Sequence, residues 1–150
     1  MLAIGDAAPD FELKDDAGQT VRLSEMLKGG PLVLYFYPAD FTPTCAREAC
    51  MFRDSHQELA ARGVRVVGVN ASRCQTHARF RAKLELPFIL LSDPERTAAR
   101  AYGAAGMLGF VRRISYLIGG DGKILDAVYA DLRLSDHKDF MSRVLARMYG

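Results

Sequence analysis

Residues 31–52 read PLVLYFYPADFTPTCAREACMF, and this stretch decides the fold. Its first part, 31–37, is a continuous apolar and aromatic run of strand length, typical of a strand buried on both faces. From Cys45 onward, residues suited to one buried face recur at spacings of four, three, four and three, the period of a helix that Gly63 would end. These residues are Cys45, Ala49, Phe52, His56 and Leu59. The stretch therefore predicts a buried strand, a short loop and a long helix.

The rest of the chain alternates between the same two patterns. Strands are predicted at 64–69, 88–91, 114–118 and 124–130, and helices over 76–86, 95–102 and 135–147. Short alternating pieces at 11–13 and 21–23 flank the turn residues 16–19 and predict an N-terminal β-hairpin. A second hairpin is predicted around the glycine-rich turn 119–122. Strands that alternate with helices indicate an α/β fold, a three-layer sandwich with a mixed central sheet.

Composition and charge limit the classes of function. The chain has 150 residues, with 20 Lys and Arg against 18 Asp and Glu and a net charge of +2. We expect one globular domain over residues 1–150 that binds neither nucleic acid nor a membrane. The longest apolar run is too short to cross a bilayer and the first residues lack the pattern of a secretion signal, so we expect a cytoplasmic protein. Three cysteines, an odd number, do not indicate a disulfide framework.

Cys45 lies where an α/β fold places its chemistry. The residues between the predicted strand and helix are PADFTPTC, 38–45, and in open α/β sheets ligands bind in loops that follow the carboxyl ends of strands. A cysteine in the first helical turn meets the positive end of the helix dipole and unpaired N–H groups, which favour the thiolate. Cys45 is therefore a candidate nucleophile, although its place on the inner side of the helix equally allows a buried core cysteine.

Thr42 and two prolines shape the surroundings of Cys45. Thr42 occupies the position of the first cysteine in a Cys-x-x-Cys motif. Its hydroxyl cannot form a disulfide, but it can hydrogen-bond a bound oxygen substrate or the thiolate, or it can cap the helix. Pro38 and Pro43 lack an N–H group and stiffen the loop, so they either shield a thiolate from water or are ordinary turn prolines.

The segment PADFTPTC resembles the Pro-x-x-x-Thr-x-x-Cys active-site motif of the peroxiredoxins, thiol peroxidases with a thioredoxin fold. The next five residues, 46–50, resemble the bacterioferritin-comigratory-protein (PrxQ) branch, in which a second cysteine follows the first after four residues. Similar segments at 5–11, 91–94 and 113–118 extend the resemblance over nearly the whole chain. The resemblance implies a thioredoxin-like three-layer sandwich and an enzyme that needs no metal, haem or flavin.

The resemblance also implies roles for individual residues. Cys45 matches the peroxidatic cysteine, which attacks the peroxide and becomes a sulfenic acid. Thr42 matches the residue that positions the peroxide, and Pro38 matches the one that shields the site. Arg113 matches the arginine that supports the thiolate and the charge on the leaving oxygen. Glu48 matches an acidic neighbour that orients this network.

Cys50 matches the resolving cysteine of this branch, so the resemblance implies a Cys45–Cys50 disulfide that thioredoxin or a similar dithiol protein reduces. In a regular helix, Cα atoms five residues apart are separated by about 8.7 Å. A disulfide tolerates no more than about 7 Å, so the helix must partly unwind before this bond forms. The implied substrates are hydrogen peroxide and organic hydroperoxides, and the implied assembly is a monomer or a weak homodimer.

Three alternatives concern neighbouring residues. Arg112 competes with Arg113, but strand alternation points the two to opposite faces, so only one can reach Cys45. Cys74 and His77 could be interpreted as a zinc site together with the other two cysteines, but their spacing is poor for zinc, and we interpret Cys74 as a spare thiol. Asn70 departs from the family, which usually has serine there.

Two other functions compete with peroxide reduction. The first is thiol–disulfide exchange with protein substrates. The absence of a cysteine at position 42, which is a threonine, argues against it. The second is a redox sensor that passes its oxidised state to a protein partner. Rapid second-order reaction with peroxide favours the peroxidase over the first, and complex formation without turnover favours the sensor.

Overall fold

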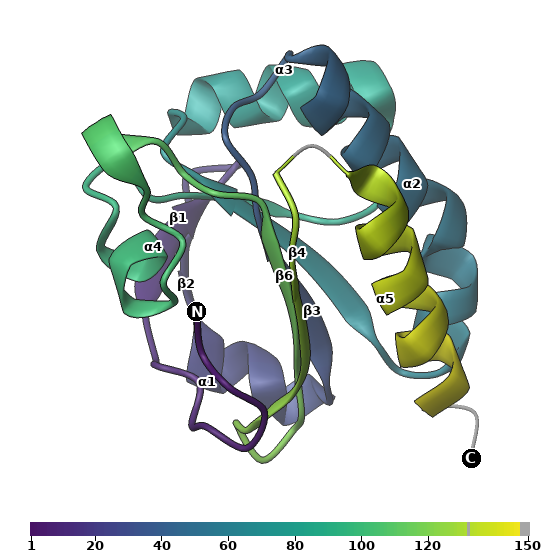
Figure 1. Ribbon diagram of the computed structural model, residues 1–150. Helices are drawn as coiled ribbons and strands as arrows, with labels where there is room; N and C mark the ends of the chain where they lie inside the picture. Colours follow the sequence, from purple (N-terminus) through teal and green to yellow (C-terminus); the bar gives the residue numbers. More distant parts are fainter. Residues whose placement is uncertain (132, 148–150) are drawn as a thin grey trace.

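The computed structural model of the chain describes residues 1–131 and 133–147. Its strands form one mixed sheet in the order β2-β1-β5-β4-β3-β6-β7 (Figure 1). The strands are β1 (Glu12–Asp15), β2 (Thr20–Arg22), β3 (Leu32–Phe36), β4 (Arg65–Asn70), β5 (Leu90–Ser92), β6 (Ile114–Ile118) and β7 (Ile124–Tyr129). Strand β3 pairs parallel to β4, and β4 pairs parallel to β5, whereas the other pairs are antiparallel. The mixed sheet and both predicted hairpins are therefore confirmed.

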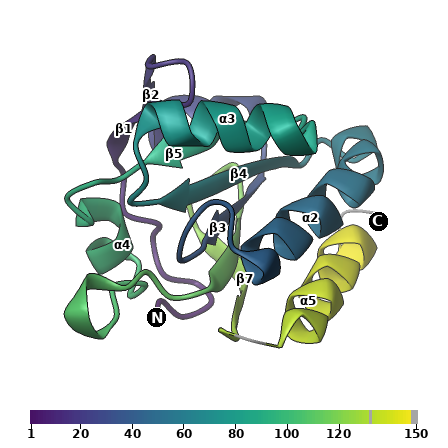
Figure 2. The same cartoon turned by 90° about the horizontal axis from the view of Figure 1, so that it is seen from above.

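Helices cover both faces of this sheet, which gives the predicted three layers (Figure 2). They are α1 (Leu23–Met26), α2 (Pro43–Ala61), α3 (Cys74–Leu84), α4 (Thr97–Ala101) and α5 (Leu134–Arg147), with two short 3₁₀ turns at Leu27–Gly29 and Met107–Gly109. Residues of α2, α3 and α5 pack with one face of the sheet in one buried cluster, and residues of α1 and α4 pack with the other face. Among the described residues, no helix is long and apolar enough to cross a membrane.

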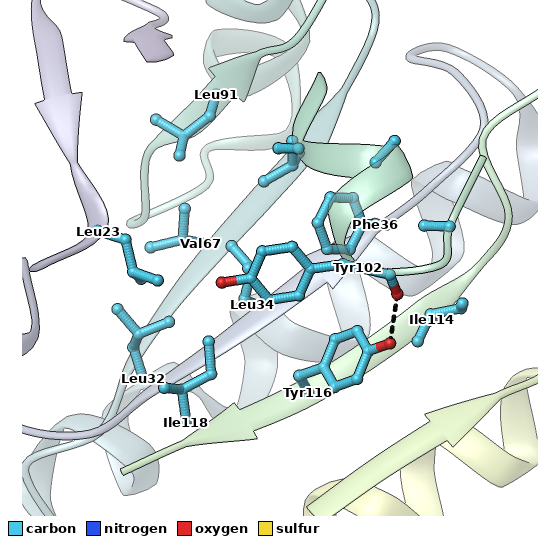
Figure 3. Close-up of a cluster of buried hydrophobic side chains, with 14 of the residues drawn as sticks. Leu23, Leu32, Leu34, Phe36, Val67, Leu91, Tyr102, Ile114, Tyr116 and Ile118 are labelled. Atoms are coloured by element: carbon cyan, nitrogen blue, oxygen red, sulfur yellow. Dashed lines mark hydrogen bonds between the residues drawn. The ribbon is translucent and has the colours of Figure 1, made fainter. Parts of the chain in front are cut away.

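Strand β3 lies inside the sheet, between β4 and β6, and every one of its residues is buried. Val33 and Tyr35 face the cluster with α2, whereas Leu32, Leu34 and Phe36 face the opposite cluster. Figure 3 shows this second cluster, in which Tyr102 and Tyr116 lie beside Phe36 and the Tyr116 hydroxyl donates to the Tyr102 carbonyl. Burial on both faces explains why the sequence of β3 is continuously apolar rather than alternating.

Several element boundaries differ from the predicted ones by one or two residues. Helix α3 begins at Cys74 because Arg73 accepts the first helical bond from the His77 N–H, and it ends at Leu84 because Glu85 adopts a left-handed conformation with φ of 54°. Helix α4 starts only at Thr97, after a left-handed Arg96. Helix α5 starts one residue before Ser135 and β7 ends one residue earlier than predicted. The single-domain prediction spans 1–150, of which 132 and 148–150 lie outside the described residues, and it stays a prediction.

Candidate active site

The loop from 37 to 42 connects the end of β3 to the start of α2. Thr42 has extended backbone geometry at the N-cap, and its Oγ1 accepts a hydrogen bond of 3.4 Å from the Cys45 N–H. Pro43 occupies the first helical position, where its missing N–H costs nothing. Thr42 therefore caps the N-terminus of α2. It also lines the cleft that contains Cys45.

Cys45 lies in the first turn of α2, only 1% exposed, as a free thiol. Its Sγ accepts a hydrogen bond of 3.3 Å from Nη2 of Arg113. A cleft lined by Pro38, Thr42 and Phe110 reaches this sulfur. Helix start, arginine and cleft together place the Cys45 sulfur beside a positive charge and within reach of a small molecule.

Arg113 is held by three hydrogen bonds to two residues, Glu48 and Asp131. Its Nη1 donates to Oε1 of Glu48 at 2.5 Å, and its Nε donates to the Asp131 carbonyl at 2.9 Å. Its backbone N–H donates to the Asp131 carboxylate at 3.0 Å. Burial opposes the charge, but Glu48 and Cys45 outweigh it and keep the pKa of Arg113 above its ordinary value. A planar fork of donors held in this way presents a fixed positive charge to the sulfur.

Arg112 has different partners, although it lies just before β6, as Arg113 does, and lines the same cleft. Its guanidinium hydrogen-bonds the Tyr129 hydroxyl and lies 5.4 Å from the centre of the Tyr129 ring. Arg112 does not contact the Cys45 sulfur, whereas Arg113 does.

Glu48 lies one turn after Cys45 and is completely buried. Burial raises the pKa of Glu48 to about 7, and the charge and hydrogen bond of Arg113 reduce this increase. Its Oε1 accepts from Arg113, whereas its Oε2 has no hydrogen-bond partner among the described residues. A carboxyl group with such a pKa changes its charge near neutral pH, directly beside the arginine that contacts Cys45.

The replacement Glu48→Gln is expected to remove a pH dependence of stability. Because the pKa of Glu48 rises from 4.5 to about 7 on folding, the folded state binds more protons than the unfolded state in this range. Stability is then fully present below the lower value and falls as the pH rises through the higher one, by up to about 3 kcal/mol. Chemical denaturation of both proteins across this range measures the effect. A wild-type curve that stays parallel to that of Glu48→Gln contradicts it.

The other two cysteines lie apart from the Cys45 cleft. Cys50 is half-buried on α2 and faces a groove between α2 and α5, beside Met51 and Lys138. Cys74 is half-buried at the first position of α3. Among the described residues, no group of three or more His, Cys, Asp and Glu is arranged to hold a metal ion.

A buried polar network that the sequence analysis missed holds the loop before α2. The Asp40 carboxylate accepts from the Tyr37 hydroxyl at 2.6 Å and lies 2.7 Å from Nδ1 of His77, whose Nε2 lies 3.0 Å from the Leu91 carbonyl. The Asn70 amide donates to the same carboxylate at 3.4 Å, which gives this departure from the family a structural role. In the sequence, this network is indicated only by the polar residues Asp40 and His77, and only the packing of α3 shows that they are in contact.

A second missed group reaches the site from α5. His137 is fully buried, and its Nδ1 lies 2.9 Å from the Ser115 hydroxyl and 3.5 Å from Oε2 of Glu48. Burial lowers the pKa of His137 below its ordinary value. The sequence signal was a histidine on the buried face of an amphipathic helix, which in itself indicates only a core position.

A buried cysteine at a helix start, with an arginine on its sulfur and a mixed α/β sheet behind it, defines a class of redox proteins that react through a thiol. The AhpC/TSA family model matches residues 4–127. Peroxiredoxin Bcp of Bacillus subtilis is 39% identical over 144 residues, covering 91% of this chain and 90% of the relative.

Solved structures give the same result. Peroxidoxin BcpB of Mycobacterium tuberculosis aligns with a TM-score of 0.90 at 37% identity, covering 99% of this chain and 97% of that one. The bacterioferritin comigratory protein of Xanthomonas campestris, from a study of alkyl peroxide reduction activity, aligns with a TM-score of 0.83 at 28% identity, covering 99% and 96%. The chain belongs to the AhpC/TSA family and is a peroxiredoxin of the Bcp and peroxiredoxin Q type. It is therefore an enzyme, a peroxidase, and the predicted thioredoxin-like fold is confirmed.

Proposed function

We propose that Cys45 is the peroxidatic cysteine and that it reduces hydrogen peroxide and organic hydroperoxides. Its thiolate attacks the terminal oxygen of the peroxide, the O–O bond breaks, and the sulfur becomes a sulfenic acid. The other oxygen leaves as hydroxide or alkoxide and takes up a proton, which yields water or an alcohol. The observation that carries this proposal is the hydrogen bond from Arg113 to the Cys45 sulfur at a helix start.

The neighbours of Cys45 have distinct roles in this proposal. Arg113 supports both the thiolate and the charge that develops on the leaving oxygen, because one guanidinium offers several donors in a fixed plane. Glu48 orients Arg113, which its hydrogen bond to Nη1 supports. Thr42 offers its hydroxyl to the peroxide, and Pro38 shields the sulfur from water, since both line the cleft.

The cleft favours hydroperoxides that carry an apolar group. Two exposed apolar side chains, Met107 and Phe110, lie at its edge, 80% and 68% exposed. Binding becomes more favourable when an apolar group of the substrate covers such surface, whereas hydrogen peroxide has no apolar group. The relative from Xanthomonas campestris, whose structure concerns alkyl peroxide reduction, supports the same substrate class.

We propose that Cys50 resolves the sulfenic acid. Its thiolate attacks the Cys45 sulfur, the S–O bond breaks, and hydroxide leaves and takes up a proton to give water. The disulfide that forms is reduced by thioredoxin or a similar dithiol protein. Both cysteines lie inside the regular helix α2, where Cα atoms five residues apart are separated by about 8.7 Å, too far for a disulfide. The first turns of α2 must therefore unwind after oxidation, which moves Cys45 out of the core and the disulfide to the surface.

Turnover with a reductant tests this proposal. Peroxide consumption is followed with thioredoxin, thioredoxin reductase and reduced nicotinamide as the electron source. Continuous consumption that depends on thioredoxin is expected. A protein that is oxidised once and then forms a lasting complex with a partner would instead be a redox sensor.

Cys50→Ser is expected to reduce one equivalent of peroxide and then stall with thioredoxin, because no disulfide can form. It should also be overoxidised to the sulfinic acid more readily than the parent. Cys74→Ser is the matched control and should turn over like the parent. Peptide mapping of the oxidised parent identifies the disulfide, and a dominant Cys45–Cys74 link would overturn the assignment.

Two further proposals concern the whole protein. The assembly is proposed to be a monomer or a weak homodimer, and sedimentation at several concentrations measures it. The location is proposed to be the cytoplasm, where thiols are kept reduced and available for this cycle.

A further inference from the structure

His137 connects the C-terminal helix to the candidate active site. It lies on α5, fully buried, with Nε2 3.0 Å from the Ala130 carbonyl and Nδ1 2.9 Å from the Ser115 hydroxyl. The same Nδ1 lies 3.5 Å from Oε2 of Glu48, whose other oxygen binds Arg113. A continuous set of contacts therefore runs from His137 through Glu48 and Arg113 to the sulfur of Cys45.

The hydrogen-bond partners of His137 determine where its protons are. The Ala130 carbonyl only accepts, so Nε2 carries a hydrogen. In the neutral ring, Nδ1 is then a bare acceptor that receives the Ser115 hydroxyl hydrogen. An ionised Glu48 would direct a second bare acceptor, Oε2, at the same nitrogen, and within the described residues this oxygen has no hydrogen-bond partner. Two buried acceptors that face each other without a proton repel.

We infer that Glu48 and His137 hold one proton between them, and that His137 is a positioning residue that keeps the charge of Arg113 available to Cys45. The proton resides on Oε2 or on Nδ1, and in either place the pair is neutral. The three side chains of Arg113, Glu48 and His137 together then carry a net charge of +1. When the pair loses its proton, Glu48 neutralises Arg113 and the group carries none.

The burial of both members supports a shared proton. Burial raises the pKa of Glu48 to about 7 and lowers the pKa of His137, so both groups resist their ionised forms when alone. The other charges that act on His137 are Arg113, Asp136 on its own helix and Asp131 in the segment before it. The hydrogen bonds from Arg113 and Tyr129 lower the pKa of Asp131, although burial opposes them, so Asp131 stays ionised. Its constant negative charge favours the protonated pair.

The consequence concerns the oxidation step and rests on the proposed roles of Cys45 and Arg113. A net positive charge beside the sulfur stabilises the thiolate and the leaving alkoxide, and this stabilisation is large because the site is buried. The reactivity of Cys45 should therefore fall when the pH rises far enough to remove the proton from the pair. His137 moves that fall to higher pH, since it shares the proton that Glu48 would otherwise release alone.

The variant His137→Asn separates this effect from a merely structural one. An asparagine amide still donates to the Glu48 carboxylate, but it accepts no proton from it, so Glu48 ionises at lower pH. Stopped-flow oxidation by hydrogen peroxide should be within about twofold of the parent at about pH 6 and slower by about tenfold at about pH 8, since one unit of pKa is a factor of ten. His56→Asn, a half-buried histidine elsewhere on α2, is the matched control and should show no pH-dependent difference.

A second variant should act in the opposite direction. Ser115→Ala removes the hydrogen bond that stabilises the bare Nδ1 of His137, so the pair should keep its proton to higher pH. The fall in Cys45 oxidation rate should then move upward in pH. This small replacement also keeps the test valid if His137→Asn fails to fold.

Nitrogen-15 NMR of the histidine rings in the intact protein tests the shared proton without any peroxide. The Nδ1 signal of His137 should move over the same pH range as the fall in oxidation rate, and Nε2 should stay protonated throughout. The inference would be overturned if the ratio of oxidation rates of the parent and His137→Asn were the same at every pH. It would also be overturned if the Nδ1 signal of His137 did not change over the pH range in which the oxidation rate falls. If Cys45 is not the peroxidatic residue, Cys45→Ser still reacts with peroxide while the NMR result is unaffected, so the two failures are distinguishable.

Discussion

Cys45→Ser is expected to abolish peroxide reduction, leaving no turnover above the uncatalysed reaction. The thiolate is the nucleophile in this account, and a serine hydroxyl at the same place stays protonated and cannot form a sulfenic acid. The fold should survive, because serine is close to cysteine in size and Arg113 can still donate to its oxygen. Burial of the hydroxyl costs about 1–3 kcal/mol at most.

Two measurements belong to this prediction. Coupled peroxide consumption reports activity, and chemical denaturation reports that the variant is folded. Cys74→Ser is the control, a half-buried cysteine outside the Cys45 cleft, and it should keep full activity. Substantial peroxide turnover by a folded Cys45→Ser would remove the central claim.

Arg113→Ala should slow the oxidation of Cys45 by about 10²–10³-fold, the usual cost of losing one donor that stabilises developing charge. Glu48 then lacks its partner and is expected to become protonated rather than remain a buried unpaired charge.

Arg112→Ala is the matched control for this prediction. Its guanidinium contacts Tyr129 rather than the Cys45 sulfur, so the oxidation rate should change by no more than about twofold. Stopped-flow oxidation compares both variants with the parent. The reverse order of effects would mean that the side chains of Arg112 and Arg113, just before β6, are directed differently from those in the structure.

The chemistry-bearing stretch could be predicted from sequence because its signals are local. A continuous apolar run, a capping threonine and a helical period are all contained in residues 31–63, and they place Cys45 at a helix start. Alternation indicated that only one of Arg112 and Arg113 reaches Cys45 but not which one, and the contact of Arg113 with Cys45 joins residues 68 positions apart. The choice of Arg113 depended on the resemblance, since no local pattern indicates which strand end lies beside α2.

The contacts that modify the site could not be predicted in the same way. Asp40 meets His77, and Glu48 meets His137, only because α3 and α5 pack beside the loop and α2. A buried histidine on a helix has the same sequence pattern whether it is a core residue or a charge partner. The boundaries of α3 and α4 were also out of reach, since left-handed Glu85 and Arg96 are not residues that favour this conformation.

Chemical trapping of the sulfenic acid in the Cys50→Ser protein tests the central claim most directly. The protein receives one equivalent of hydrogen peroxide in the presence of a reagent specific for sulfenic acids, and the labelled peptide is identified by mass spectrometry. The account predicts a single label on Cys45. A label found mainly on Cys74, or an unlabelled protein whose peroxide remains unconsumed, would contradict it.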